Sequence, residues 1–436
     1  MLVVGSAIAN SGSYADWPGW RGPAADGRTD AVLPIDIDSI EEVWTVDVPG
    51  RGGSTPVING DTIYLTSGVE GRNRLIALDA TDGSVRFETE IGDDAGNKHR
   101  KGGGSNSSPV VADTAEGRRA VVAYFRSGDL AGVDAETGDL LWRHNVPERF
   151  GQGDLWWDRG NSPCAFAAAE GTASDGIVLP VMETGIGYVL CLDAGDGSVR
   201  WKCPRPHDAP RESGQSYTTP VVLPPIAGTA ATHVAVLGAD VVTAHRLDTG
   251  DVDAILEGLN PRGEGNWRSI ASPVVAGPRL IVPYGRGETS TAINVRRWLS
   301  DRDAVPVDWV RRDVAADVMT PAADGQDVIV MTDPRGGVST MSMLDGSTGQ
   351  TRWSVELSKS RHDYSASPLV AGRHVYAVRD DGHVTVVGPI DAPEPAVVSQ
   401  RRFGDGEAFT VASAVPIEGD LLIRTRHRLH RIGAGR

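Results

Sequence analysis

The feature of this sequence that most constrains its fold is a short segment that returns about every 50 residues. Each copy begins with Ser or Thr, followed in seven of the eight by Pro, and the copies start at positions 55, 108, 162, 219, 272, 320, 367 and, in degenerate form, 413. A period of this length indicates a solenoid or a propeller. The 436 residues therefore favour one repeat array over the two or three domains that length alone suggests.

A second motif lies between these segments and reads Asp-x-x-Thr/Asp-Gly, with a bulky residue four positions after the Gly. It predicts a tight turn, because the carboxylate accepts backbone N–H groups and Gly permits positive φ. Polarity alternates on each side as in strands, so the bulky residue is expected on the strand after the turn, packed against the neighbouring sheet. The copies are Asp79–Gly83 with Phe87, Asp134–Gly138 with Trp142, Asp193–Gly197 with Trp201, Asp345–Gly349 with Trp353, and a weaker one at 247–250 with Ala254 in the bulky position.

Each repeat has room for about four short strands, which is typical of a propeller blade. In the first repeat we expect strands at 56–59, 62–67, 74–79 and 84–90. The eighth repeat, 411–432, holds three strands, and residues 42–48, with Trp44 in the bulky position, are expected to supply the fourth. Such closure removes the open edges of an incomplete ring. We therefore predict an all-β, eight-bladed β-propeller of four-stranded antiparallel blades over 42–436.

Little else in the chain departs from this scheme. No segment forms a convincing amphipathic helix, and the best candidate, 296–310, contains Pro306. Residues 1–15 are an apolar leader rich in small residues and resemble a secretory signal that lacks its positive start. Residues 16–41 form an N-terminal extension. We expect an exported protein, either periplasmic or secreted.

Charge and cysteine content exclude several classes of function. The formal net charge is −16, so a nucleic-acid partner is not expected, because phosphate binding needs a basic footprint. No stretch is long and apolar enough to span a membrane. The three cysteines show no metal-binding spacing, so no metal site is expected. Cys191 and Cys203 flank a predicted hairpin, and both a disulfide and two free thiols are compatible with that placement.

The segment 133–142, Val-Asp-Ala-Glu-Thr-Gly-Asp-Leu-Leu-Trp, and its copies at 193–201 and 345–353 resemble the repeat of the pyrroloquinoline-quinone-type (PQQ-like) β-propeller family. In that family the motif is a tryptophan-docking device between blades. The segment 16–23, Asp-Trp-Pro-Gly-Trp-Arg-Gly-Pro, is similar to the opening of exported bacterial members. The resemblance covers nearly the whole chain from residue 42 and is specific for fold rather than for function.

The family divides by chemistry. Quinoprotein dehydrogenases carry PQQ and calcium and usually have adjacent cysteines, which this chain lacks, and no matching set of Glu, Asn and Asp is found. Neither cofactor is therefore expected, and no catalytic residue is assigned. The scaffold branch of the outer-membrane β-barrel assembly machinery, BamB-like, is eight-bladed, non-enzymatic and close in size to this chain.

Polar and aromatic side chains just before each repeat segment are the candidate ligand contacts, because these loops converge on the central channel. Such a set suits a polar ligand such as a sugar or a peptide, although ordinary solvated loops have the same composition. The candidates are Arg51, Asn106, Arg159, Asn161, Gln215, Tyr217, Trp267, Arg268, Asp317, His362, Asp363, Tyr364 and Glu407. His362, Asp363 and nearby Ser365 do not predict a hydrolase, because sequence adjacency does not define a triad and no nucleophile elbow is present.

Two long loops depart from the repeat. The loop 92–106 carries Lys98 and Lys101, and it is interpreted either as a contact for an acidic partner or as a solvated loop. The loop 150–161 carries Trp156 and Trp157, which either bind a partner or pack across the channel mouth. We predict a monomeric, non-enzymatic protein-interaction scaffold in the cell envelope. The alternatives are a carbohydrate- or small-molecule-binding propeller and, less favoured, a PQQ-dependent oxidoreductase.

Overall fold

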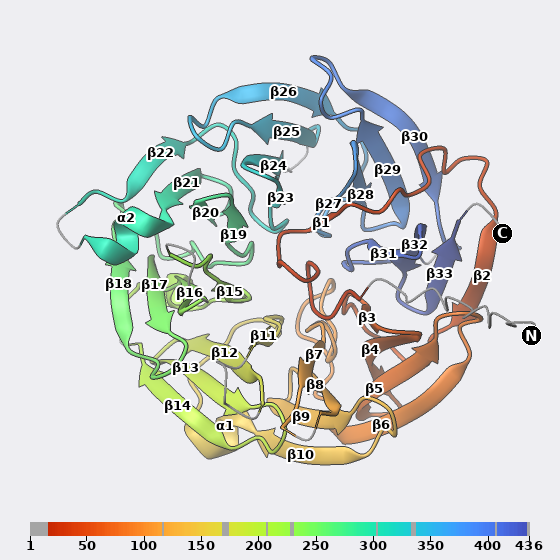
Figure 1. Cartoon of the computed structure of the whole chain (residues 1–436), viewed down its shortest axis with the longest axis horizontal. Helices are drawn as coiled ribbons and strands as arrows, with labels where there is room; N and C mark the ends of the chain where they lie inside the picture. The colour runs from red at the N-terminus through yellow and green to blue at the C-terminus, as the bar shows by residue number, and fades with distance from the viewer. Residues whose placement is uncertain are drawn as a thin grey trace, which may run out of the picture.

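The structure is a computed structural model that describes residues 16–115, 117–167, 174–205, 208–226, 231–301, 304–332, 337–405 and 408–433. The predicted leader, 1–15, and Glu407 lie outside these ranges. Eight antiparallel sheets stand around a central channel, with one strand edge of each sheet toward the axis (Figure 1). The predicted eight-bladed, all-β propeller is confirmed.

The strands of blades one to four follow one another from the axis outward. They are β3 (Val57–Asn59), β4 (Thr62–Val69), β5 (Arg72–Asp79) and β6 (Val85–Asp93); β7 (Val110–Asp113), β8 (Arg119–Tyr124), β9 (Asp129–Asp134) and β10 (Leu140–Asn145); β11 (Cys164–Phe166), β12 (Gly176–Glu183), β13 (Ile186–Asp193) and β14 (Val199–Pro204); and β15 (Val221–Val222), β16 (His233–Gly238), β17 (Val241–Arg246) and β18 (Val252–Leu256).

Blades five to seven repeat this order, and blade seven gains a fifth strand, β1 (Arg28–Thr29), which runs parallel to its innermost strand. Their strands are β19 (Val274–Ala276), β20 (Arg279–Tyr284), β21 (Thr289–Asn294) and β22 (Val307–Arg311); β23 (Ala322–Asp324), β24 (Asp327–Thr332), β25 (Thr340–Leu344) and β26 (Thr351–Glu356); and β27 (Leu369–Ala371), β28 (His374–Val378), β29 (His383–Gly388) and β30 (Ala396–Arg402).

Blade eight closes the ring as predicted. Its three C-terminal strands are β31 (Val415–Ile417), β32 (Asp420–Arg424) and β33 (Arg428–Ile432), and β2 (Glu42–Asp47) pairs antiparallel with β33 as the outermost strand. Trp44 lies opposite Arg431 in this ladder. The first and last strands of the propeller are thus held in one sheet (Figure 1).

In the part of the chain that the structure describes, three short helical turns interrupt the β structure: α1 (Val146–Phe150), α2 (Val295–Ser300) and the 3-10 turn η1 (Arg211–Gly214). The candidate helix 296–310 is therefore helical only at its start. Asn294 caps α2, because its side-chain oxygen accepts the N–H of Arg297. Pro306 precedes β22, where the chain has already returned to a strand.

Docked tryptophans join neighbouring blades. The indole N–H of Trp142 donates to the carbonyl of Ala194 in the next blade at 2.9 Å, and the Trp142 ring lies where a Cβ on Gly197 would be, at 2.5 Å. The glycine of the turn is therefore required twice, for its positive φ of 68° and for the space that the ring fills. The same bond is made by Trp44 to Ala80, Trp201 to Leu247, Trp309 to Gly346 and Trp353 to Ile390.

Where the indole is missing, other side chains compensate. Phe87 packs over Gly138, and the hydroxyl of Tyr64 donates to the carbonyl of Ala135 at 2.7 Å in place of an indole. Blade four has Ala254 in the docking position, and the buried Trp298 of α2 packs in the same cluster.

Blade seven has Ser399 in the docking position, opposite Val386 and beside the bulge of the β29–β30 ladder. The extension replaces the indole here. The hydroxyl of Ser399 accepts the N–H of Ile37 at 3.3 Å and donates to the carbonyl of Ile35. Leu33 and Ile37 are buried in the cluster that joins blades seven, eight and one. Residues 33–37 thus bridge this blade junction from outside.

The Ser/Thr of the repeat segment forms a belt around the channel. The backbone N–H of Thr55 donates to the hydroxyl of Ser108 in the next blade at 2.9 Å. Equivalent bonds link 108 to 162, 162 to 219, 219 to 272, 272 to 320, 320 to 367 and 413 to 55. Within the described ranges, the bond that would link 367 to 413 is not formed. The motif is thus an inter-blade contact, and the belt is interrupted between blades seven and eight.

The N-terminal extension crosses the centre of the ring before it reaches the outer strand β2 (Figure 1). Its backbone adds to the inner strands of four blades: Trp17 exchanges two hydrogen bonds with Ile58, and the carbonyls of Pro18, Asp26 and Gly27 accept the N–H groups of Val111, Ala323 and Val370. Arg21, 3% exposed, donates to the carbonyls of Pro321 and Pro368 at 2.8 and 2.5 Å. The segment 16–29 therefore covers part of one mouth of the channel.

The three cysteines are free thiols. Cys191 lies opposite Trp201, and Cys203 lies opposite Val189, so the two cysteines of the predicted hairpin are offset by two residues along adjacent strands. The disulfide alternative is therefore wrong. Burial raises the pKa of Cys164 and of Cys191 to about 12, so both are inert at neutral pH.

Candidate functional site

The candidate site lies at the mouth of the channel opposite the extension. Strand direction alternates in an antiparallel blade, so the turns between strands one and two and between strands three and four share one end, here called the turn face. The connections between strands two and three, and those from one blade to the next, share the other end, here called the loop face. All of the predicted contact loops belong to the loop face.

The loop 92–106 is fastened across the loop face by Lys101. Its ammonium group lies 2.7 Å from carboxylate oxygens of both Asp363 and Asp380 and donates to the Ser365 hydroxyl at 3.0 Å. Asp380 belongs to blade seven and its side chain is 4% exposed. Lys101 is thus committed to an internal ion pair rather than offered to an acidic partner.

This cluster also argues against Ser365 as a nucleophile activated by a lysine. Burial lowers the pKa of Lys101, but the Asp380 and Asp363 carboxylates outweigh burial and hold the pKa above its usual value. A protonated lysine donates to the serine and does not remove its proton. The cluster is therefore structural: it acts as a latch that fastens the loop 92–106 to Asp363, Ser365 and Asp380.

Asp158 joins the two long loops to each other. Its carboxylate accepts the backbone N–H groups of Lys98 and His99 at 2.8 and 3.0 Å and lies 2.6 Å from the guanidinium of Arg126. The ammonium of Lys98 donates to the carbonyl of Leu155 at 2.6 Å. The loops 92–106 and 150–161 therefore form one cover over the mouth.

Trp156 and Trp157 lie in this cover, and each remains 39% exposed. The indole N–H of Trp157 donates to Glu212 at 2.8 Å, and the His99 ring meets the Trp157 ring edge-on at 5.2 Å. Burial and the charges of Lys101 and Arg100 lower the pKa of His99, which favours the neutral imidazole. Trp157 thus packs within this cover, and both indole rings still present aromatic surface to solvent.

Several of the predicted polar residues are already bonded to other side chains of the loop face. Arg268 bridges Glu212 at 3.7 Å and Asp317 at 2.9 Å. Arg159 pairs with Glu183 at 2.7 Å, and the Tyr217 hydroxyl donates to Gln215 at 2.9 Å. A hollow beside Arg159 and Tyr217 measures about 10 Å³, about the room that one water needs.

The remaining predicted residues are dispersed. Trp267 and Tyr364 are 7% and 2% exposed, so both lie in the core and offer a ligand almost no surface. Asn161 is buried and donates to the carbonyl of Pro180. Asn106 contacts the Lys101 carbonyl at 3.5 Å. Arg51 and His362 lie on the loop face: the Arg51 backbone pairs with Gly68, and the His362 ring accepts from Arg361.

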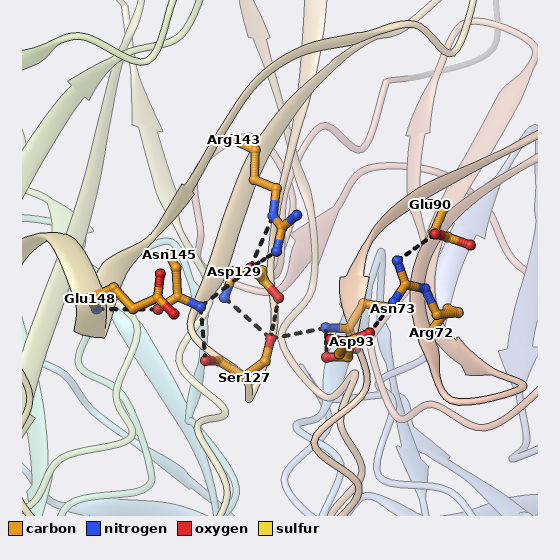
Figure 2. A network of polar contacts seen from close by, with 9 residues as sticks. All are labelled: Arg72, Asn73, Glu90, Asp93, Ser127, Asp129, Arg143, Asn145 and Glu148. Carbon is orange, nitrogen blue, oxygen red and sulfur yellow. Dashed lines mark hydrogen bonds and ion pairs between the residues drawn. The ribbon is translucent and has the colours of Figure 1, made fainter.

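Sequence reasoning missed a second polar network on the outer part of this face. Figure 2 shows Asp129 at its centre, where it accepts from Arg143 at 2.7 Å and from Ser127 at 2.7 Å. Asn73 donates to the same Ser127 at 2.9 Å and so joins blade one to blade two. None of these residues belongs to a repeat motif, and no sequence signal marked them.

The fold and this covered channel define a class: an eight-bladed β-propeller whose blades are joined by docked tryptophans. The family model described as outer membrane protein assembly factor BamB matches residues 24–165 and 297–393, more than half of the chain. The protein belongs to that family.

Solved structures share the fold at low sequence identity. A quinohemoprotein alcohol dehydrogenase from Pseudomonas putida HK5 is 14% identical, with a TM-score of 0.66 over 96% of this chain and 80% of that one. BamB from Moraxella catarrhalis is 15% identical, with a TM-score of 0.57 over 90% of this chain and 99% of that one. A europium-containing methanol dehydrogenase is 11% identical, with a TM-score of 0.65 over 96% and 98%. No curated protein sequence matches the chain significantly.

Among the described residues, neither a membrane-spanning helix nor a metal-binding cluster is found. None of the described helices has the length and apolar character needed to cross a bilayer. Within the same ranges, no group of three or more His, Cys, Asp or Glu side chains is arranged to hold a metal ion.

Proposed function

We propose that the protein is an exported, non-enzymatic scaffold that binds a protein partner in the cell envelope through its loop face. The observation that carries this proposal is the exposed pair Trp156 and Trp157, held on a cover whose polar groups are already paired with each other. A surface of this kind suits a macromolecular partner, because partly exposed Trp residues on a fixed base are typical interaction hot spots.

The same geometry gives no support to a cofactor enzyme. The two loops bond to each other across the mouth through Asp158, and the hollow beside Arg159 holds about one water. We therefore expect neither PQQ nor calcium to bind. The leader-like residues 1–15 and the family to which the chain belongs support the proposal of export.

The test compares two double variants of the full chain in crosslinking from an envelope extract. Trp156→Ala/Trp157→Ala is expected to lose a stoichiometric partner that the wild type recovers, since each hot-spot Trp contributes about 2 kcal/mol or more. Val85→Ala/Leu140→Ala removes apolar side chains that are 48% and 45% exposed and is expected to keep the partner. Equal recovery by both variants, or no stoichiometric partner for the wild type, would contradict the proposal. A sugar that binds the wild type alone would favour the carbohydrate alternative.

A further inference from the structure

The inner strand edges of the blades facing the channel are docking edges, and the chain itself demonstrates their use. In four blades the third residue after the Ser/Thr of the repeat donates its N–H to an extension carbonyl: Ile58, Val111, Ala323 and Val370 do so at 2.9, 2.7, 3.0 and 2.8 Å, and in blade seven Gly372 also donates to Thr29 at 3.2 Å. Each of these residues lies in the second pair of the ladder between strands one and two. In antiparallel ladders such groups alternate in direction, so these N–H groups point toward the channel.

Blade five presents the same edge without such a bond. Val275 is the third residue after Ser272 and lies opposite Leu280, the register that Ile58 and Ala323 have in their own ladders. Its N–H therefore points inward as theirs do. Within the described residues, no backbone bond joins the extension to Val275. Figure 1 shows β19 on the side of the channel that faces the extension.

A hollow of about 430 Å³ opens at this edge, on the turn face. It is lined by Val275 of β19, by Asp324 and Gly325 of blade six, and by Asp26 and Arg28 of the extension. Space of this size accommodates one amino-acid side chain with part of its backbone. No Cβ contact lies within 4 Å of Gly325, so the wall is open at that point.

The charge around the hollow favours a cation. Arg28 is bonded to Asp324 at 2.9 Å and to Asp30 at 2.7 Å, and its backbone N–H donates to Asp26 at 3.0 Å. Two guanidinium groups, those of Arg28 and Arg21, therefore lie among the three carboxylates of Asp26, Asp30 and Asp324 and leave one negative charge in excess. Burial raises the pKa of Asp26 and outweighs the Arg28 N–H and the Arg21 charge, which lower it, so a further cation beside this carboxylate would favour its charged form.

We propose that this hollow binds an extended peptide segment with a basic side chain, which adds to the inner edge of β19 through Val275 while its Lys or Arg enters between Asp26 and Asp324. The segment would continue, in blade five, the pairing that the extension makes in blades one, two, six and seven. This is β-strand addition with a charged side-chain pocket, a recurring mode of peptide recognition. It lies at the opposite end of the ring from Trp156 and Trp157 and is independent of the scaffold proposal.

The fold itself supplies a variant that removes only the backbone donor. The equivalent of Val275 in blade eight is Pro416, opposite Leu421 in the same register, so proline is accommodated at this position. Val275→Pro deletes the inward N–H and leaves the carboxylates in place. Asp26→Asn/Asp324→Asn deletes the charges and leaves the N–H. Asp113→Asn is the matched control, because Asp113 is an exposed turn-face carboxylate of blade two that also pairs with an Arg, at 3.1 Å.

The probe is the fluorescently labelled, end-blocked peptide Ala-Val-Lys-Val-Ala, titrated into the full chain by anisotropy, with Ala-Val-Glu-Val-Ala in parallel. We expect the Lys peptide to bind at least 10-fold more tightly than the Glu peptide. We expect Val275→Pro and the double Asn variant to weaken it at least 5-fold, while Asp113→Asn and Trp156→Ala/Trp157→Ala leave it within 2-fold. Hydrogen exchange of the segment 274–276 should slow when the peptide binds.

Several results would overturn the proposal. Equal binding of the two peptides, or equal weakening by Asp113→Asn, would show general attraction to an acidic surface. Unchanged binding to Val275→Pro, or unchanged exchange at 274–276, would show that β19 is not the docking edge. Spermidine competing as well as the Lys peptide does would show a site for free amines instead. The melting temperature of each variant confirms that a loss of binding is not a loss of fold.

Discussion

The substitution of a tyrosine hydroxyl for an indole at the junction of blades one and two gives a sharp prediction. In the other docked junctions an indole N–H reaches the carbonyl that follows the turn Asp or its equivalent, whereas here Phe87 has no donor and the Tyr64 hydroxyl bonds Ala135 at 2.7 Å. Tyr64→Phe keeps the ring and leaves that buried carbonyl without its partner. The expected cost is about 1–3 kcal/mol of unfolding free energy.

Phe87→Trp should rescue that loss. A Trp at this position faces Gly138 as Trp142 faces Gly197, and its N–H is directed at the carbonyl of Ala135. Alone, the substitution is expected to change stability by less than about 0.5 kcal/mol, because Tyr64 already donates to that carbonyl. In the Tyr64→Phe background it should restore about 1 kcal/mol, the usual net value of one buried hydrogen bond.

The assay is equilibrium urea unfolding of the wild type, both single variants and the double variant, read as a double-mutant cycle. Tyr376→Phe is the control, because Tyr376 is a buried tyrosine that donates to the carbonyl of Pro34 at 2.9 Å in blade seven, where Phe87→Trp is too distant to help. A coupling energy below about 0.3 kcal/mol between positions 64 and 87 would refute the interpretation, and so would equal rescue of Tyr376→Phe.

Three further predictions follow from contacts described above. Lys101→Met should lower the melting temperature and speed amide exchange across 92–106, because Asp380 stays buried without its cation. Adding Asp380→Asn should recover most of the lost stability. Exchange at the wild-type rate in Lys101→Met would refute the latch. A thiol reagent at pH 8 should label at most Cys203 in the native protein and all three cysteines after unfolding; fewer than three would indicate a disulfide. Hydrogen bonds within its own turn lower the pKa of Asp345 to about 2, so its contribution to stability is present above pH 4 and is lost as pH falls toward 2. The urea midpoint of Asp345→Asn should fall less over that window than the wild-type midpoint does.

The repeat architecture could be predicted because the residues that form its turns lie close together in the sequence. Asp134 and Gly138 define a hairpin within six residues. Trp44 indicates the closing strand, because it occupies the bulky position in a segment with the alternating polarity of a strand. Trp309 was not predicted as a docking residue, because the local turn signal is missing in its blade. Blade five replaces the Asp–Gly turn with α2, so no turn marked the docking position.

The candidate site could not be read in this way. Lys101 and Asp363 are separated by 262 positions in the chain, and only the closed ring brings them together. Trp267 and Tyr364 look like surface aromatics in sequence because polar residues surround them, but their loops turn inward at the channel. Local patterns report which residues share a strand, while the loop face is assembled from eight blades at once.

The path of the N-terminal extension, here also called the arm, has a consequence for the order in which the ring can fold and close. Arg21 bonds to Pro321 and Pro368, which follow it by 300 and 347 positions, and β2 finds its sheet only when β33 exists. At about 5–20 residues per second, a nascent chain carries this arm for roughly 15–60 s before its first partner in blade six is synthesised. During that interval the arm has no native place to bind among the later blades. Because β2 pairs with β33, the ring stays incompletely closed until the last strand has been synthesised.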